Sequence, residues 1–298
     1  MDQAQNLRNI IKQINQTEAG QARIITVTSG KGGVGKTSVS INLAIQFRKQ
    51  GKSVIIFDAD FGLANIEVMF GAIPKYNLSD MIYRGKSIKD IIVKGPMDIG
   101  FISGGSGING LGNLGYDQIN YLVYKLRELE SLTDIIIVDT GAGISDSVLG
   151  FVASGSEVLL IATPEPTSIT DAYALLKALN AKAGFESDNT IIHVIANRVS
   201  SHEEGVNLYN KLNVVVSKFL NIKLNFLGIV PKDDNLGRAV MQQKPVSLIY
   251  PNSTASKHFA ALASELMNDE AYVEEKKNKG LASAILKMLK NKEKKTDS

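Results

Sequence analysis

The sequence contains no cysteine and no tryptophan, and only three of its 298 residues are histidine. Without thiols, the chain cannot form a disulfide framework, a thiolate zinc site, an iron–sulfur cluster or a cysteine nucleophile. His193, His202 and His258 lie far apart in the sequence, so we do not expect a histidine-rich metal site. The lack of cysteine also fits a protein of the reducing cytoplasm.

Long hydrophobic runs are missing too. No window approaches the roughly 18 apolar residues that a membrane-spanning helix requires. The N-terminus has no basic region followed by an apolar run, so we expect no secretory signal. With 44% hydrophobic and 21% charged residues, the composition is that of a soluble globular protein. The length allows one large α/β domain or two ordinary ones.

Positive charge is scarce outside the C-terminal tail. Residues 274–298 carry eight lysines against four acidic residues, whereas the rest of the chain has 25 basic and 26 acidic residues. A surface for duplex DNA needs clustered lysine and arginine to replace counterions. We therefore expect no direct nucleic-acid partner.

Apolar runs and helical patterns alternate along the body of the chain. Strands are expected at 23–29, 53–58, 133–139, 157–162, 190–196 and 224–230, and helices at 36–50, 166–184, 203–220 and 254–267. Continuously apolar strands separated by amphipathic helices predict an α/β fold, a mostly parallel sheet with helices on both faces. We expect one domain over residues 21–272, an N-terminal helix and linker over 1–20, and a tail over 273–298. A ligand should bind at the carboxyl ends of the strands.

A phosphate-binding loop is the strongest signal in the sequence. Residues Gly30-Lys31-Gly32-Gly33-Val34-Gly35-Lys36-Thr37 match G-x-x-x-x-G-K-[ST] between an expected strand and an expected helix. The glycines let backbone N–H groups turn toward phosphate oxygens at a helix N-terminus. We expect Lys36 to reach the β- and γ-phosphates and Thr37 to ligate Mg²⁺, with Ser38 next to them.

The second lysine of this loop, Lys31, is unusual. With it, the loop resembles the deviant Walker A motif of the MinD/ParA family of ATPases, which have a P-loop NTPase fold. The resemblance implies an ATP-dependent homodimer in which Lys31 reaches the nucleotide of the partner. Lys31, Lys36 and one aspartate, Asp60, are then the expected catalytic residues.

Acidic residues follow two of the expected strands. Asp58 and Asp60 come at and after the end of one, and Asp139 ends the other in a Walker B pattern. Asp139 should hold Mg²⁺, and Gly141 and Gly143 after it would allow close approach to the γ-phosphate. By resemblance to the MinD family, Asp60 orients the attacking water and Asp58 supports the Mg²⁺ sphere.

Two further loops are candidates for contact with the base of the nucleotide. The strand at 190–196 is followed by Asn197 and Arg198, without the aspartate with which common GTPases read guanine. In the resembled family this asparagine contacts adenine, and a loop like that around Pro231 and Asp233 lies beside the base. The expected ligands are therefore ATP and ADP with Mg²⁺.

The tail carries a short amphipathic pattern. Leu281, Ile285, Met288 and Leu289 fall on one helical face with a lysine-rich rim, which is typical of a helix lying in an anionic membrane interface. The alternative is a helix that packs on the body before a solvated lysine tail. The family's C-terminal membrane-targeting helix favours the first, and with it a cytoplasmic protein reversibly bound to the inner face of the cell membrane.

Residues 2–8 point to one branch of this family. Their pattern, D-Q-A-x-x-L-R, resembles the N-terminal activator motif of the FlhG (YlxH/FleN) group. The resemblance implies that Gln3 stimulates the GTPase FlhF, with flagellar C-ring switch proteins as further partners. A helix that merely caps the domain is the plain alternative. A septum-site MinD, a ParA-type DNA-segregation ATPase and a module that binds nucleotide without hydrolysis remain the other functional hypotheses.

Overall fold

The computed structural model describes residues 22–60, 65–104, 116–183, 185–268 and 281–282. The expected activator helix with Gln3 lies outside these residues, as do Ile285, Met288 and Leu289 of the expected lipid-facing surface.

The described residues form one eight-stranded sheet with strand order β3-β4-β2-β5-β1-β6-β7-β8. The strands are β1 (Arg23–Ser29), β2 (Val54–Ala59), β3 (Val93–Lys94), β4 (Gly100–Ile102), β5 (Ile135–Ala142), β6 (Glu157–Ala162), β7 (Ile191–Val199) and β8 (Leu224–Pro231). Neighbouring strands are parallel, except that β3 runs antiparallel to β4. The predicted mostly parallel α/β sheet is confirmed.

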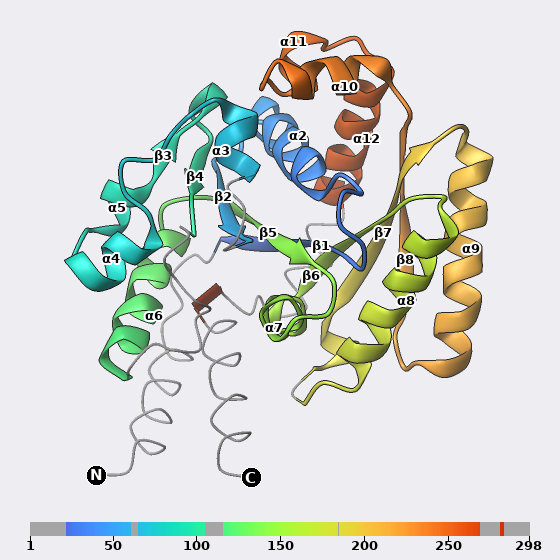
Figure 1. The fold of residues 1–298 in the computed structure, drawn as a ribbon, viewed down its shortest axis with the longest axis horizontal. Coiled ribbons are helices and arrows are strands. Elements are labelled where there is room, and N and C mark those ends of the chain that lie inside the picture. Colours follow the sequence, from blue (N-terminus) through green and yellow to red (C-terminus); the bar gives the residue numbers. More distant parts are fainter. Residues whose placement is uncertain (1–21, 61–64, 105–115, 184, 269–280, 283–298) are drawn as a thin grey trace.

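Helices cover both faces of the sheet (Figure 1). One face carries α2 (Lys36–Lys49), α3 (Asn65–Phe70), α10 (Asp234–Met241), α11 (Val246–Ile249) and α12 (Thr254–Asn268). The other carries α4 (Leu78–Arg84), α5 (Ile88–Ile91), α6 (Tyr116–Glu130), α7 (Asp146–Ser154), α8 (Pro166–Asn180) and α9 (His202–Phe219). Successive strand residues point to opposite faces, so Ile25 joins the first layer's core and Ile24 the second.

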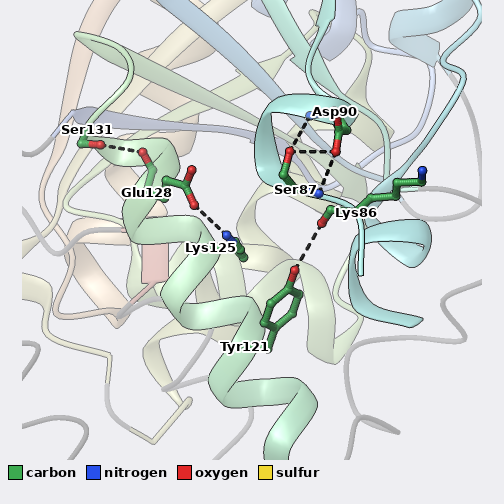
Figure 2. Close-up of polar contacts among 7 residues, drawn as sticks. All are labelled: Lys86, Ser87, Asp90, Tyr121, Lys125, Glu128 and Ser131. Atoms are coloured by element: carbon green, nitrogen blue, oxygen red, sulfur yellow. Dashed lines mark hydrogen bonds and ion pairs between the residues drawn. The ribbon is translucent and has the colours of Figure 1, made fainter. Parts of the chain in front are cut away.

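Local capping holds the small helices in place. At the start of α5, the Ser87 hydroxyl accepts a hydrogen bond from the Asp90 N–H at 3.2 Å, and the Asp90 carboxylate accepts one from the Ser87 N–H at 3.0 Å (Figure 2). This capping box satisfies two amides at the helix start. The Tyr121 hydroxyl of α6 donates to the Lys86 carbonyl at 3.2 Å and so joins α6 to this turn.

A buried ion pair lies at the amino ends of the central strands. Arg23 of β1 donates two hydrogen bonds of 2.8 Å to the two carboxylate oxygens of Glu157 on β6. Both side chains are buried, and the ion pair compensates their opposite charges within the core. The pair joins β1 to β6 at the amino ends of these strands, on the side of the sheet opposite to the carboxyl ends.

Candidate nucleotide-binding site

The predicted phosphate loop joins β1 to α2 at the carboxyl edge of the sheet. Gly33 and Gly35 have φ angles of 74° and 98°, which L side chains rarely adopt. No side chain among the described residues caps the first turn of α2. Its N–H groups are therefore available to an anionic phosphate, which the positive end of the helix dipole also attracts.

The loop is wedged between neighbouring elements. A Cβ atom on Gly30 would lie 2.1 Å from the backbone carbonyl carbon of Asp171 in α8, and one on Gly35 would lie 2.6 Å from Nδ2 of Asn197. Neither position can take a side chain unless the backbone of α8 or the Asn197 amide moves. Gly30 and Gly35 thus allow the loop to pack closely against α8 and Asn197, in addition to the positive φ angle that Gly35 supplies.

Strand order brings the two acidic strand ends together. β2 and β5 are neighbours, with Asp58 directly beside Asp139. Asp139 is buried, and its carboxylate accepts hydrogen bonds from the Thr37 hydroxyl at 2.7 Å and the Ser40 hydroxyl at 3.0 Å. Ser40 was not predicted from the sequence. Its spacing of three residues from Thr37, on the same side of α2, was the signal that could have identified it.

The hydrogen-bond donors and positive charges around the buried carboxyl groups of the site do not fully offset the cost of ionising these groups. Burial is the main cause that raises the pKa of Asp139 to about 6, against the hydrogen bonds from Thr37 and Ser40 and the charge of Lys36. Burial and then the charge of Asp139 raise the pKa of Asp58 to about 8. Oδ2 of Asp58 is buried without a hydrogen-bond partner among the described residues.

This donor set fits a hard divalent cation, which prefers hydroxyl and carboxylate oxygens and would favour the ionised carboxyls. Thr37 and Asp139, with Asp58 beside them, are the residues that would hold Mg²⁺. Burial also lowers the pKa of Lys36, while Asp139 and Asp60 oppose this shift. A bound phosphate would act in the same direction as these two carboxylates and keep the ammonium charged.

Asp60 lies at the same edge, against the segment that follows Asp139. Its backbone N–H donates to Oδ1 of Asp58 at 3.1 Å. A Cβ atom on Gly141 would lie 3.6 Å from Oδ1 of Asp60, so the segment after Asp139 lies next to the Asp60 carboxylate. Gly143, with φ of 89°, donates its N–H to the carbonyl of Ser29 at 3.0 Å and links this segment to the phosphate loop.

The second lysine of the loop has partners within its own chain. Nζ of Lys31 lies 2.5 Å from Oε2 of Glu165 and 2.8 Å from the Thr167 hydroxyl, at the start of α8. The hydrogen bond and charge of Lys31 lower the pKa of Glu165, with smaller effects from Arg198 and Lys232. Glu165 was not predicted as part of the site, because nothing in its local pattern distinguishes it from a solvated acid.

Asn197, which is expected to contact the base, is hydrogen-bonded to the protein backbone in this structure. Nδ2 of Asn197 donates to the carbonyl of Val34 at 2.7 Å, and its Oδ1 accepts from the N–H of Arg198 at 2.9 Å. The Asn197 amide therefore supports the phosphate loop in this structure. Arg198 is exposed and has a φ angle of 59°, an uncommon backbone conformation that is often found at functional sites.

The second base-side loop follows β8, which ends at Pro231. The Asp233 carboxylate accepts hydrogen bonds of 2.8 Å from the N–H groups of Asn235 and Ala255. It thus joins the starts of α10 and α12. Contact of Asn197, Arg198, Pro231 or Asp233 with adenine remains a prediction.

Leu281, expected on the lipid-facing side of the tail, is buried in this structure. It packs in the core cluster between the sheet and α6. In the described part of the chain, no helix has both the length and the apolar character to cross a bilayer.

A glycine-rich loop between β1 and α2, with Asp139 hydrogen-bonded to its Thr37 and Asp58 beside Asp139, defines a P-loop nucleotide-binding protein. The chain belongs to the CobQ/CobB/MinD/ParA nucleotide-binding family, whose model matches residues 25–246. It is similar to the antiactivator FleN of Pseudomonas aeruginosa, with 41% identity over 82% of this chain and 86% of that protein. The flagellum site-determining protein YlxH of Helicobacter pylori is 35% identical over 91% of each chain.

The fold is also that of a solved relative. The septum site-determining protein MinD of Pyrococcus horikoshii, complexed with Mg-ADP, is matched with a TM-score of 0.65 and 23% identity over 84% of this chain and 97% of that one. The protein is an ATPase of the MinD/ParA family. The Mg-ADP bound by the Pyrococcus horikoshii protein agrees with the predicted cofactors of this chain, ATP or ADP with Mg²⁺. The predictions of family, fold and ATPase activity are confirmed.

Proposed function

We propose that this ATPase is a nucleotide-controlled switch of the FlhG type, which regulates the number and placement of flagella. Its similarity to FleN and YlxH, over most of the length of each, supports this assignment. The activator-like pattern at residues 2–8 agrees with it. The proposed organisation is an N-terminal activator segment over 1–20, the ATPase domain over 21–272 and a membrane-targeting tail over 273–298.

The observation that carries the switch is the position of Lys31. Its side chain is about one-third exposed, and Glu165, its carboxylate partner, is more than half exposed. An ion pair this open to water is worth little, so a more highly charged acceptor can displace it. The proposed acceptor is the triphosphate bound to a second copy of the chain. Lys36, deeper in the loop, serves the nucleotide of its own chain.

Hydrolysis would return the switch to the single-chain state. Lys36 positions the terminal phosphate, and the carboxylate of Asp60 orients the attacking water by accepting a hydrogen bond from it. Bound Mg²⁺ supplies positive charge that stabilises the charge developing on the phosphates. Loss of the γ-phosphate removes the acceptor of Lys31 across the interface, so the equilibrium shifts toward separate chains.

Three outputs follow from this switch. Gln3 stimulates GTP hydrolysis by FlhF, because an uncharged side chain of this kind can orient a hydrolytic water. Flagellar C-ring switch proteins bind the dimer that forms with ATP. Two tails on one dimer bind an anionic membrane much more tightly than one, since the second binds at high effective concentration. The protein would therefore cycle between the cytoplasm and the inner face of the cell membrane.

Sedimentation analysis with a non-hydrolysable ATP analogue and Mg²⁺ tests the switch. Wild-type protein should become a dimer, Lys31→Ala should bind the nucleotide and stay a monomer, and Asp60→Ala should form a dimer that persists with ATP. A Lys31→Ala protein that dimerises normally would refute the cross-interface contact.

The flagellar assignment has its own test. GTP turnover by purified FlhF should rise when the wild-type protein is added and should rise much less with Gln3→Ala. Equal stimulation by both proteins would remove the role of Gln3, and no stimulation by either would remove FlhF as a partner.

A further inference from the structure

Three side chains on one face of α2 hold a single residue of α11. The N–H of Ser247 donates to Oδ1 of Asn42 at 2.9 Å. Nε2 of Gln46 donates to the Ser247 hydroxyl at 3.1 Å, and Nζ of Lys49 donates to the Ser247 carbonyl at 3.0 Å. The three α2 residues have the spacing of one helical face, and Figure 1 shows α11 next to α2. The amide, the hydroxyl and the carbonyl of Ser247 are therefore all hydrogen-bonded to α2.

The inner end of this bridge is fully buried. Asn42 is 0% exposed and Ser247 is 1% exposed. Ser247 lies in the first turn of α11, where the N–H groups have no intrahelical partner. The residue before this helix, Pro245, has no side-chain oxygen that could accept from them. Asn42 accepts in its place, and because buried polar groups are costly unless they are hydrogen-bonded, the contact fixes α11 on α2.

The same Asn42 side chain also reaches the first turn of α2. Its Nδ2 donates to the carbonyl of Ser38 at 2.8 Å. Ser38 directly follows Thr37, whose hydroxyl is hydrogen-bonded to Asp139. The donor and the acceptor of a carboxamide lie on one planar group. One buried side chain thus connects the end of the phosphate loop with α11.

The helix α11 belongs to a unit that carries the second base-side loop. Nε2 of Gln242, which follows α10, donates to the hydroxyl of Tyr250, which follows α11, at 3.2 Å. The Tyr250 carbonyl accepts from the Ser256 hydroxyl of α12 at 2.8 Å. The carboxylate of Asp233 joins the starts of α10 and α12. Because these helices are cross-linked, a shift of α11 on α2 would also move the loop between β8 and α10.

We propose that Asn42 is a positioning residue for the nucleotide, which keeps the base-side loop at the correct distance from the phosphate loop. The inference rests on the expected contact of that loop with adenine and does not depend on dimerisation. Asn42 acts through the two elements that it connects. Without its amide, the phosphate loop still binds phosphates, but the nucleoside and the phosphates of one ligand no longer fit both loops at once.

Calorimetric titration of the full-length protein with ADP and with pyrophosphate, both with Mg²⁺, tests this role. Neither ligand has a γ-phosphate, so the proposed dimer does not enter the measurement. Asn42→Leu keeps the approximate size of the side chain and removes the amide. It should weaken ADP binding by about tenfold or more and pyrophosphate binding by less than about twofold. A loss of stability alone would not change the ratio of the two affinities.

Two control variants separate positioning from other effects. Gln50→Leu is the matched substitution, because Gln50 follows α2 and donates to Ser264 of α12 at 3.4 Å, outside the bridge. Glu157→Gln is the stability control, because it disrupts a buried ion pair at the opposite side of the sheet. Both should keep the wild-type ratio of ADP to pyrophosphate affinity. A fall in this ratio in Glu157→Gln as large as in Asn42→Leu would overturn the proposal.

The outcomes for Asn42→Leu are equally distinct. Equal losses of ADP and pyrophosphate affinity, or no loss of either, would overturn the positioning role. If the wild type binds ADP no more tightly than pyrophosphate, the expected adenine contact fails together with this inference, whereas the proposed switch is still decided by sedimentation. If circular dichroism shows that Asn42→Leu does not fold, the exposed bridge residue Lys49 decides: Lys49→Met should lower the affinity ratio by about two- to threefold, and an unchanged ratio would overturn the proposal.

Discussion

Replacing Asp58 by asparagine should stabilise the magnesium-free protein at neutral and alkaline pH. The Asp58 carboxyl has a pKa of about 8 in the fold, against 3.8 for an unperturbed aspartate, chiefly through burial and then through the charge of Asp139. Between these two values the folded chain holds a proton that the unfolded chain has lost. The free energy of unfolding therefore falls as pH rises through this window.

The size of the effect follows from the shift. At about 1.4 kcal/mol per pKa unit, a change of about four units corresponds to about 6 kcal/mol once the pH exceeds the folded value. Asparagine does not titrate, so the variant escapes this loss. The difference in unfolding free energy between variant and wild type should grow by several kcal/mol from about pH 4.5 to about pH 8.5.

Urea unfolding in the presence of EDTA, followed by circular dichroism at both pH values, measures this difference. Asp188→Asn is the control, because it removes an exposed carboxylate of the short helix at Ser187–Asn189. Mg-ATP should raise the melting temperature of the wild type more than that of Asp58→Asn, since the variant lacks a carboxylate beside the cation. A variant–wild-type difference that is the same at both pH values would refute the buried, proton-holding carboxyl.

Three more substitutions test other parts of the structure. Gly30→Ala should abolish ATP binding in calorimetry, because its Cβ would lie 2.1 Å from the backbone of α8; wild-type affinity would show that α8 yields. Ser40→Ala removes one donor to Asp139 and should weaken Mg²⁺-dependent ATP binding by about tenfold, while nucleotide binding in EDTA stays the same; an unchanged Mg²⁺ dependence would contradict this role. Glu157→Gln leaves the Arg23 guanidinium buried without its carboxylate and should cost about 3–5 kcal/mol in urea unfolding, with ATP affinity unchanged; a loss below about 1 kcal/mol would refute the buried pair.

Most of the long elements were predictable and the short ones were not. All six predicted strands and all four predicted body helices are present, with ends that differ by a few residues. Nothing was predicted between β2 and β5. The longest element missed there is the fifteen-residue α6, although Leu122, Leu126 and Leu129 have the spacing of one helical face. The others are short: α3, α4 and α5 have four to seven residues, and β3 and β4 have two and three. Elements this short show less than two repeats of their hydrophobic period. The capping residues Asn77 and Ser87 were the available signal.

The family resemblance suggested roles for individual residues but did not reveal their contacts within this chain. Asn197 holds the phosphate loop, Asp233 joins two helix starts, Lys31 is paired with Glu165, and Leu281 lies in the core. Each of these contacts joins residues whose proximity depends on the packing of separate elements. A pattern along the chain carries no information about such a partner.

The sequence by itself determined the strands, the glycine-rich phosphate loop and the helix that follows it. These depend on neighbouring residues, whose φ preferences and apolar periodicity act over a few positions. Only the tertiary structure decided that β5 lies between β1 and β2, which places Asp58 beside Asp139, and that the Asp139 carboxylate meets the Thr37 hydroxyl. It also decided that Asn42 meets Ser247, because strand order and helix packing are set by the burial of the whole core rather than by any local segment.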